Sequence, residues 1–227
     1  MRDKEEILFR YKGLHDTLND MSGKWGGVKI LPVTKTVDAE RILYLKEAGV
    51  EQIGENRVQE AMEKLDALNG AFDIHIIGRM QTNKAKYASR FASVIQSIDR
   101  IELCEALERA LDKAGRTMKA LIEVNIGNDP NKAGISEEET SDFVRKMKAY
   151  PHLIVKGLMT VAPIVQDAEE VRPYFQRMRR LFDGIRQESG GENMDTLSMG
   201  MSNDCFIAAQ EGATIVRIGS AIFGRRQ

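Results

Sequence analysis

Cysteine is scarce in this sequence of 227 residues, which contains only Cys104 and Cys205. The two lie far apart and form no Cys-x-x-Cys pair, so they do not make a disulfide framework. No combination of cysteine and histidine has the spacing of a zinc site. We therefore expect a protein of a reducing compartment, without a metal centre.

Long apolar runs are missing as well. No stretch approaches the ~20 apolar residues that are needed to cross a bilayer. Residues 1–10 lack the apolar segment of a signal peptide. Both absences predict a cytoplasmic protein that does not insert into a membrane.

Neither sign of charge is in excess, because 33 lysine and arginine residues balance 34 aspartate and glutamate residues. Without a basic field, the chain has no electrostatic means of recruiting nucleic acid or an anionic membrane. GxGxxG and Walker A sequences are absent too. These absences favour a small-molecule partner of another kind.

Short apolar runs alternate with amphipathic segments along the whole chain. Each run has the length of a buried strand, and several are rich in valine and isoleucine. Eight such units predict a parallel sheet covered by helices, and they fit one compact (β/α)₈ TIM barrel over residues 1–227. An open doubly wound sheet is the alternative, since the second run is very short. The predicted strands are 28–33, 52–54, 74–77, 94–98, 120–126, 154–159, 196–199 and 214–218, and the predicted helices are 4–19, 39–48, 57–68, 82–91, 101–114, 137–149, 168–187 and 203–210.

Polar residues and glycines mark the ends of the predicted helices. Ser136 before three glutamates is a capping-box pattern, and Asp38 and Asp99 are placed to cap the helices that follow them. Gly190–Gly191 is expected to form a flexible loop inside the domain. Four glycines follow helical segments, as is usual at C-terminal caps: Gly49, Gly70, Gly115 and Gly212.

Lys35 follows the first predicted strand directly, among apolar and hydroxyl-bearing neighbours. Active sites of such barrels lie at the carboxyl ends of the strands. A partly desolvated lysine there has a lowered pKa and can attack an aldehyde. An ordinary solvated lysine at the start of a loop is the alternative.

The residues at the ends of the last two predicted strands are candidates for a phosphate site. Ser198 and Ser202 lie between a strand and a helix, where hydroxyls and free backbone N–H groups can bind an anion. Arg217 is a charge inside an apolar strand, and Gly219 and Ser220 follow it. A serine cap and an arginine paired with a structural carboxylate are the ordinary alternatives.

Three further residues are candidates for ligand contacts. Asn56 follows the second strand, and His75 lies within the third strand, where a satisfied core histidine is the alternative. Met199 is placed for packing near the mouth and for contact with a ligand face. A nucleophilic lysine and a phosphate cradle on one barrel face suit an aldehyde joined to a phosphate. Pyridoxal phosphate and a sugar phosphate both meet that description, and the residues alone leave the choice open.

Six motifs in this order resemble the pyridoxal phosphate homeostasis proteins, also called the YggS-like or proline synthetase co-transcribed family. The resemblance covers nearly the whole chain. It implies a fold like the N-terminal barrel of alanine racemase and a Schiff base between Lys35 and pyridoxal 5'-phosphate (PLP). The motifs are VTKT (33–36), GENRVQE (54–60), HIIGRMQTNK (75–84), GLMTVAP (157–163), LSMGMS (197–202) and VRIGSAIFG (216–224).

The resemblance also assigns the other contacts. Ser198, Gly219 and Ser220, with Ser202 close by, would bind the phosphate. Arg217 would face the pyridine nitrogen, Asn56 would lie near the ring hydroxyl, and His75 and Met199 would complete the site. Relatives often have threonine in place of Ser220, which preserves the hydroxyl, and Pro32 and Thr34 depart from the usual small residues.

Three functions are compatible with such a site. The first is a PLP carrier that supplies apo PLP-dependent enzymes, the second a racemase-like PLP enzyme, and the third a Schiff-base aldolase. Racemases of this fold resemble the barrel plus a second, β-rich domain, and the barrel here occupies the sequence up to Gln227. We therefore expect a monomeric PLP carrier without turnover. Lys84–Lys86 and Arg225–Arg226 are candidates for a second, surface PLP site, with a solvated face as the alternative.

Overall fold

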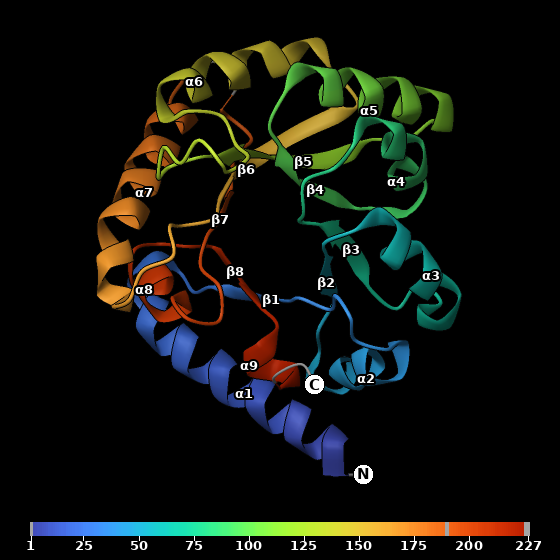
Figure 1. The fold of residues 1–227 in the computed structure, drawn as a ribbon, viewed down its shortest axis with the longest axis vertical. Coiled ribbons are helices and arrows are strands. Elements are labelled where there is room, and N and C mark those ends of the chain that lie inside the picture. Colours follow the sequence, from blue (N-terminus) through green and yellow to red (C-terminus); the bar gives the residue numbers. More distant parts are fainter. Residues whose placement is uncertain (1, 189–190, 225–227) are drawn as a thin grey trace.

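The computed structural model describes residues 2–188 and 191–224. Eight parallel strands stand in a ring, in the order β1-β8-β7-β6-β5-β4-β3-β2 (Figure 1). The (β/α)₈ barrel predicted from the sequence is thereby confirmed. The strands are β1 (Lys29–Pro32), β2 (Gln52–Glu55), β3 (Asp73–Ile76), β4 (Val94–Ile98), β5 (Met118–Val124), β6 (Leu153–Thr160), β7 (Thr196–Ser198) and β8 (Ile215–Ile218).

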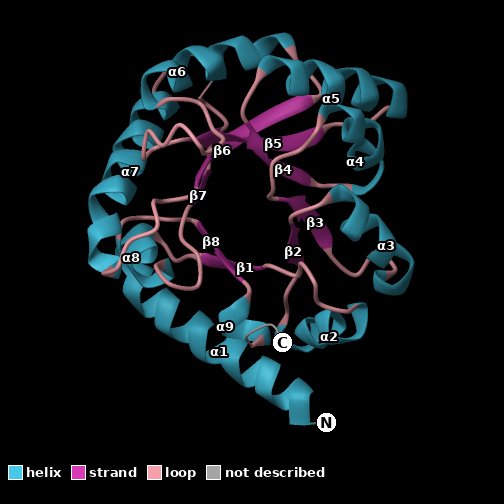
Figure 2. Ribbon diagram, in the orientation of Figure 1, coloured by secondary structure: helices cyan, strands magenta, loops and turns pink. Residues whose placement is uncertain are grey.

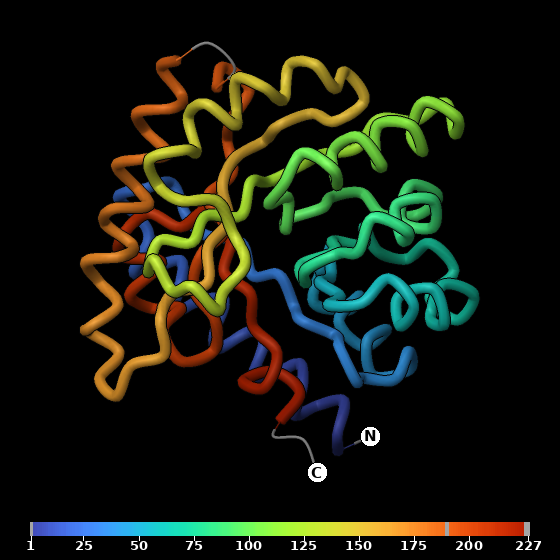
Figure 3. Tube along the Cα trace, turned by 45° about the horizontal axis from the view of Figure 1, so that its top comes forward, coloured from blue at the N-terminus to red at the C-terminus, as the bar shows by residue number. Residues whose placement is uncertain are grey.

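The helices form a layer outside this ring (Figure 2). α1 runs along the outside of the barrel and contacts α8 and α9 (Figure 3). Several predicted helices end or begin as a 3₁₀ turn. The helices are α1 (Arg2–Ser22), α2 (Ala39–Leu43), α3 (Val58–Leu68), α4 (Ala85–Phe91), α5 (Ile101–Ala114), α6 (Glu137–Lys146), α7 (Arg172–Arg186), α8 (Cys205–Gln210) and α9 (Ser220–Phe223), and the 3₁₀ turns are η1 (Gly23–Trp25), η2 (Tyr44–Ala48), η3 (Thr82–Lys84), η4 (Met147–Ala149) and η5 (Ala168–Val171).

The ring closes where β1 meets β2, through an isolated bridge. β1 pairs with β8 along its length, from Lys29 opposite Ile215 to Pro32 opposite Ile218. Toward β2 it has the bridge between Val33 and Gly54, beside a hydrogen bond from the Thr34 N–H to the Gly54 carbonyl (2.9 Å). The absence of a side chain at Gly54 permits this approach, because a Cβ there would lie 3.1 Å from the Leu31 side chain.

Alternation along the strands divides the buried side chains into two sets. The larger set fills the space between strands and helices. The smaller set lies inside the barrel, where Val94, Leu121 and Met159 pack together with Val161 beside them. Other interior positions carry polar side chains, and these lead to the mouth of the barrel.

Two of the three expected helix caps are confirmed. The Ser136 side chain accepts from the Glu139 N–H, and Asp38 accepts from the Arg41 N–H. The expectation for Asp99 is wrong, because its carboxylate pairs with Arg79 and Arg100 and leaves the start of α5 without a side-chain cap. Gly190, in the expected flexible loop, lies outside the described residues, as do Arg225 and Arg226.

Within 2–188 and 191–224, no helix is both long enough and apolar enough to cross a membrane. In the same part of the chain, no three histidine, cysteine or acidic side chains stand close enough to hold a metal ion.

Candidate functional site

A cavity of about 1430 Å³ opens at the carboxyl ends of the strands, beside β1, β6, β7 and β8. Barrel enzymes and binding proteins place their sites at this face. Five residues singled out from the sequence line the cavity together: Lys35, Ser202, Arg217, Gly219 and Ser220.

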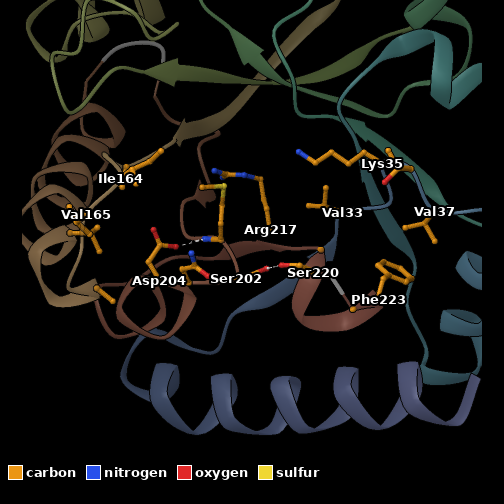
Figure 4. Close-up of a pocket in the computed structure, with 18 of the residues that line it drawn as sticks. Val33, Lys35, Val37, Ile164, Val165, Ser202, Asp204, Arg217, Ser220 and Phe223 are labelled. Carbon is orange, nitrogen blue, oxygen red and sulfur yellow. Dashed lines mark hydrogen bonds between the residues drawn. The ribbon is translucent and has the colours of Figure 1, made fainter. Parts of the chain in front are cut away.

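Lys35 sits in a tight turn directly after β1. The turn closes with a hydrogen bond from the Val37 N–H to the Thr34 carbonyl (3.0 Å). Thr36, at its third position, has φ of 63°, which is a left-handed conformation rarely adopted by a β-branched residue. The turn directs the Lys35 side chain into the cavity, on the side that faces Arg217 (Figure 4).

The opposite wall combines the turn after β7 with the start of α9. The Ser202 and Ser220 hydroxyls lie 3.3 Å apart (Figure 4). The first N–H groups of a helix have no partner within the helix and attract anions. Gly219 approaches the neighbouring strand closely, because a Cβ there would lie 3.2 Å from the Val33 carbonyl oxygen. Two hydroxyls and a helix start therefore converge on one part of the cavity.

Arg217 is the charged group at the floor of the cavity, with 4% of its surface exposed. Its guanidinium donates to the Ser198 hydroxyl (2.7 Å) and to the Thr160 carbonyl (2.8 Å). Burial lowers the pKa of Arg217 to about 10, against the opposing effect of Asp204 and Glu123. The side chain therefore remains a cation at neutral pH.

A chain of hydrogen bonds continues from Arg217 across the barrel interior. The Ser198 hydroxyl donates to Gln96 Oε1 (2.7 Å), and Gln96 Nε2 lies 2.9 Å from His75 Nδ1. Burial lowers the pKa of His75 to about 4, so the ring is neutral and its Nδ1 accepts from the Gln96 amide. His75 Nε2 is buried without a hydrogen-bond partner. Ser198 and His75 thus lie behind Arg217, and neither lines the cavity.

The structure places Met199 and Asn56 outside the cavity lining as well. Ser198 points into the barrel, so the next side chain along the strand points to the other face. Met199 is accordingly packed, fully buried, in the outer core. Asn56 lies in the bend after β2, and its carbonyl oxygen would be 2.4 Å from a Cβ at position 78, where the sequence has Gly78.

Gln96 and Glu123 are polar interior residues that the sequence analysis did not single out. The Glu123 carboxyl on β5 is buried, and its Oε2 has no hydrogen-bond partner. Burial raises the pKa of Glu123 to about 7; Asp99 adds to the shift, and Arg217 and Arg79 oppose it. A charged or amide side chain within an apolar strand was the signal that could have identified both.

The fold and this cavity define a class of barrel. Residues 13–227 match the family described as the alanine racemase N-terminal domain. Alanine racemase from Corynebacterium glutamicum has a similar structure, with a TM-score of 0.71 and 17% identity over 96% of this chain and 60% of its own. This likeness concerns the fold alone.

Closer relatives narrow the class. A pyridoxal phosphate homeostasis protein of Aquifex aeolicus is 40% identical over 88% of this chain and 87% of its own. A pyridoxal phosphate homeostasis protein of Corynebacterium glutamicum is 36% identical over 92% of this chain and 96% of its own. PipY of Synechococcus elongatus, solved with PLP bound, has a TM-score of 0.86 and 31% identity over 96% of this chain and all of its own. The chain belongs to the pyridoxal phosphate homeostasis proteins, within the alanine racemase N-terminal domain family.

Proposed function

We propose that this protein binds PLP in the cavity, attached covalently through Lys35, and serves the homeostasis of the cofactor. The observation that carries the proposal is the convergence of the Lys35 side chain, the Arg217 cation and the Ser202–Ser220 hydroxyl pair on one cavity. The PLP-bound structure of PipY, a relative of the same length class, supports it.

The chemical groups of the cavity match those of the cofactor. PLP supplies an aldehyde that condenses with a primary amine and releases water. Ser202, Ser220 and the start of α9 offer hydroxyl and N–H donors for its phosphate, with the backbone of Gly219 beside them. Arg217 is held by Ser198 and Thr160, so it offers a fixed cation to the ring nitrogen. We propose that Asn56, His75, Ser198 and Met199, which lie outside the cavity lining, hold the residues that contact PLP in place. Ser198 does so through its hydrogen bond with Arg217.

We further propose that the protein carries PLP to apo-enzymes without catalysing a reaction of its own. The close relatives are named as homeostasis proteins, which supports this role. An arginine at the ring nitrogen keeps its charge and leaves that nitrogen unprotonated, which weakens the electron sink that carbanion chemistry needs. We place this monomeric carrier in the cytoplasm; both cysteines are free and buried, which suits a reducing compartment.

Titration of the purified protein with PLP tests the attachment. Wild type is expected to form an absorbance band near the visible edge that borohydride abolishes, and mass spectrometry of the reduced protein should place the adduct on Lys35. Lys35→Ala should lack the band. Lys29→Ala, at the exposed start of the same strand, is the matched control and should keep it. The proposal would be contradicted if the borohydride-reduced adduct were found on another lysine, or if no adduct were found.

The carrier role is tested on the same PLP-loaded protein. Amino acids are added, and racemised, decarboxylated or deaminated products are sought by chiral chromatography. The expected result is no turnover beyond slow exchange of the cofactor, together with reactivation of an apo PLP-dependent enzyme. Rapid product formation would establish the racemase-like alternative instead.

A further inference from the structure

A buried ion cluster lies against the turn that bears Lys35. Its centre is Lys64 on α3, whose side chain is 12% exposed. The ammonium donates to the Thr34 carbonyl (2.8 Å), to Glu55 Oε1 (2.8 Å) and to Glu60 Oε1 (2.9 Å). A lysine has three protons to donate, so this ammonium is fully committed to fixed acceptors.

The cluster also holds the other side of the turn. Glu60 Oε1 accepts a short hydrogen bond from the Thr36 N–H. Lys64 therefore binds the carbonyl of the residue before Lys35, and Glu60 binds the N–H of the residue after it. Both peptide groups that flank Lys35 are tied to one helical turn of α3.

The turn needs such support because Thr36 has φ of 63°. A left-handed conformation costs an ordinary L-residue roughly 1–2 kcal/mol, and the surrounding structure must impose it. Glycine at position 36 would adopt it without that cost. The hydrogen bonds from α3 thus stabilise a left-handed conformation that threonine at position 36 does not favour by itself.

Glu55, at the end of β2, is the third charged member of the cluster. Its carboxyl is almost fully buried and accepts from the Thr34 hydroxyl (2.6 Å) as well as from Lys64. A buried ion pair is seldom better for stability than a well-packed apolar pair. An ion cluster at this place therefore suggests a role beyond stability.

We propose that Glu60 and Lys64 are positioning residues for Lys35, which clamp its turn in the left-handed conformation and so fix the lysine amine for attack on the PLP aldehyde. The inference rests on the proposed attachment through Lys35. In the attachment, the Lys35 nitrogen forms a bond to the aldehyde carbon, and the aldehyde oxygen leaves as water. The clamp contributes by holding the turn in the left-handed conformation, so that the amine is already placed when this bond forms.

Glu60→Ala is the direct test, because this side chain is partly exposed and its loss frees the Thr36 N–H. We expect the affinity for PLP, followed by the visible band, to fall about tenfold, the equivalent of the left-handed cost. The circular dichroism of the bound cofactor's band should fall too, since a mobile lysine no longer holds one orientation. Glu63→Ala, an exposed carboxylate on the same helix, is the matched control and should leave both unchanged.

The decisive variant is Thr36→Gly added to Glu60→Ala. Glycine adopts the left-handed turn without the clamp. The affinity for PLP should therefore return to within roughly threefold of the wild-type value. A merely structural role of Glu60 would not be rescued by a change at position 36. If Glu60→Ala fails to fold, Glu60→Met, which keeps the length of the side chain but has no oxygen to accept from the Thr36 N–H, replaces it, and unchanged affinity and dichroism in that variant would overturn the proposal.

The outcomes separate the two proposals. Absence of a Lys35-dependent band in wild type refutes the attachment itself. A normal Lys35-dependent band with wild-type affinity and dichroism in Glu60→Ala refutes only the clamp. A loss that Thr36→Gly does not restore also refutes the clamp.

Discussion

At the scale of single residues, part of the barrel interior is polar where a stability argument alone would make it apolar. Arg217, Ser198, Gln96 and His75 form one continuous chain of hydrogen bonds. Every link is buried, so each polar group depends on its neighbour for the hydrogen bond that water no longer provides. Such a chain fixes the orientation of the Arg217 guanidinium beneath the cavity, which is what recognition of a ring nitrogen requires.

Glu123 gives the molecule a specific pH dependence. Its pKa is raised from 4.5 to about 7, mainly by burial, so between these values the carboxyl is protonated in the folded state and ionised in the unfolded state. The unfolded state then binds fewer protons, and stability falls as the pH rises from about 4.5 to about 7. Glu123→Gln should remove this fall, a difference on the order of 3–4 kcal/mol at one pKa unit per 1.36 kcal/mol.

Urea unfolding of wild type and Glu123→Gln across pH 4–8 measures this difference. Glu138→Gln, an exposed carboxylate at the start of α6, is the control and should follow wild type. Parallel profiles for wild type and Glu123→Gln would mean that the carboxyl titrates alike in the folded and unfolded states, and the raised pKa would then be wrong.

At the scale of elements, the turn between β7 and α8 brings Ser202 to the wall of the cavity where we propose that the phosphate binds. Gly200 has φ of 93°, and its carbonyl accepts from the Arg217 N–H (2.9 Å). The Met201 N–H then donates to Asp204 Oδ1 (2.5 Å), which closes the turn that carries Ser202. The chain bends here because one residue can enter the left-handed region and leave room for α8.

Gly200→Ala should disrupt this turn. A Cβ at that position would lie 2.5 Å from the Ala208 Cβ, so both backbone strain and overpacking act. We expect a loss of about 2–4 kcal/mol in unfolding free energy together with weaker PLP binding. Gly184→Ala within α7, where an added Cβ meets nothing within 4 Å, should instead stabilise the protein by about 0.5–1 kcal/mol. Equal effects of the two substitutions in thermal unfolding would contradict this account.

At the scale of the whole molecule, the cavity spans the end of β1 and the ends of the three strands that follow it around the ring on one side, β8, β7 and β6. Lys35 follows β1, and the serine pair comes from segments after β7 and β8. A ligand held by all of these segments binds the folded state and not the unfolded chain. It must therefore stabilise the barrel by mass action.

Thermal unfolding with and without PLP tests this coupling. At a free concentration of 100 times Kd, PLP should stabilise wild type by about 2.7 kcal/mol. Lys35→Ala should show a smaller rise in Tm, because only the phosphate and ring contacts remain. Pyridoxamine phosphate, which has no aldehyde, should stabilise wild type and Lys35→Ala equally. If pyridoxamine phosphate raised the Tm of wild type more than that of Lys35→Ala, Lys35 would stabilise the ligand without a covalent bond, which would argue against covalent attachment.

The sequence by itself determined the elements and the order in which they follow one another. Strand and helix periods are local properties, so the eight strands and the flanking helices were placed to within a few residues. Lys35 could be identified for the same reason, since a residue directly after a parallel strand lies at the active face of a barrel wherever that strand sits. The serine and glycine pattern near the end of the chain indicated an anion site through equally local chemistry.

Only the tertiary structure decided which partners those residues have. Ser198 and Met199 are neighbours in the chain, yet the phase of the pleat sends one into the barrel and the other into the outer core. Asp99 could have capped α5 but finds Arg79, from the preceding strand end, close by. The clamp of Glu60 and Lys64 on the Lys35 turn exists only because α3 packs back beside β1. Contacts between segments distant in sequence depend on packing, and packing has no local signature.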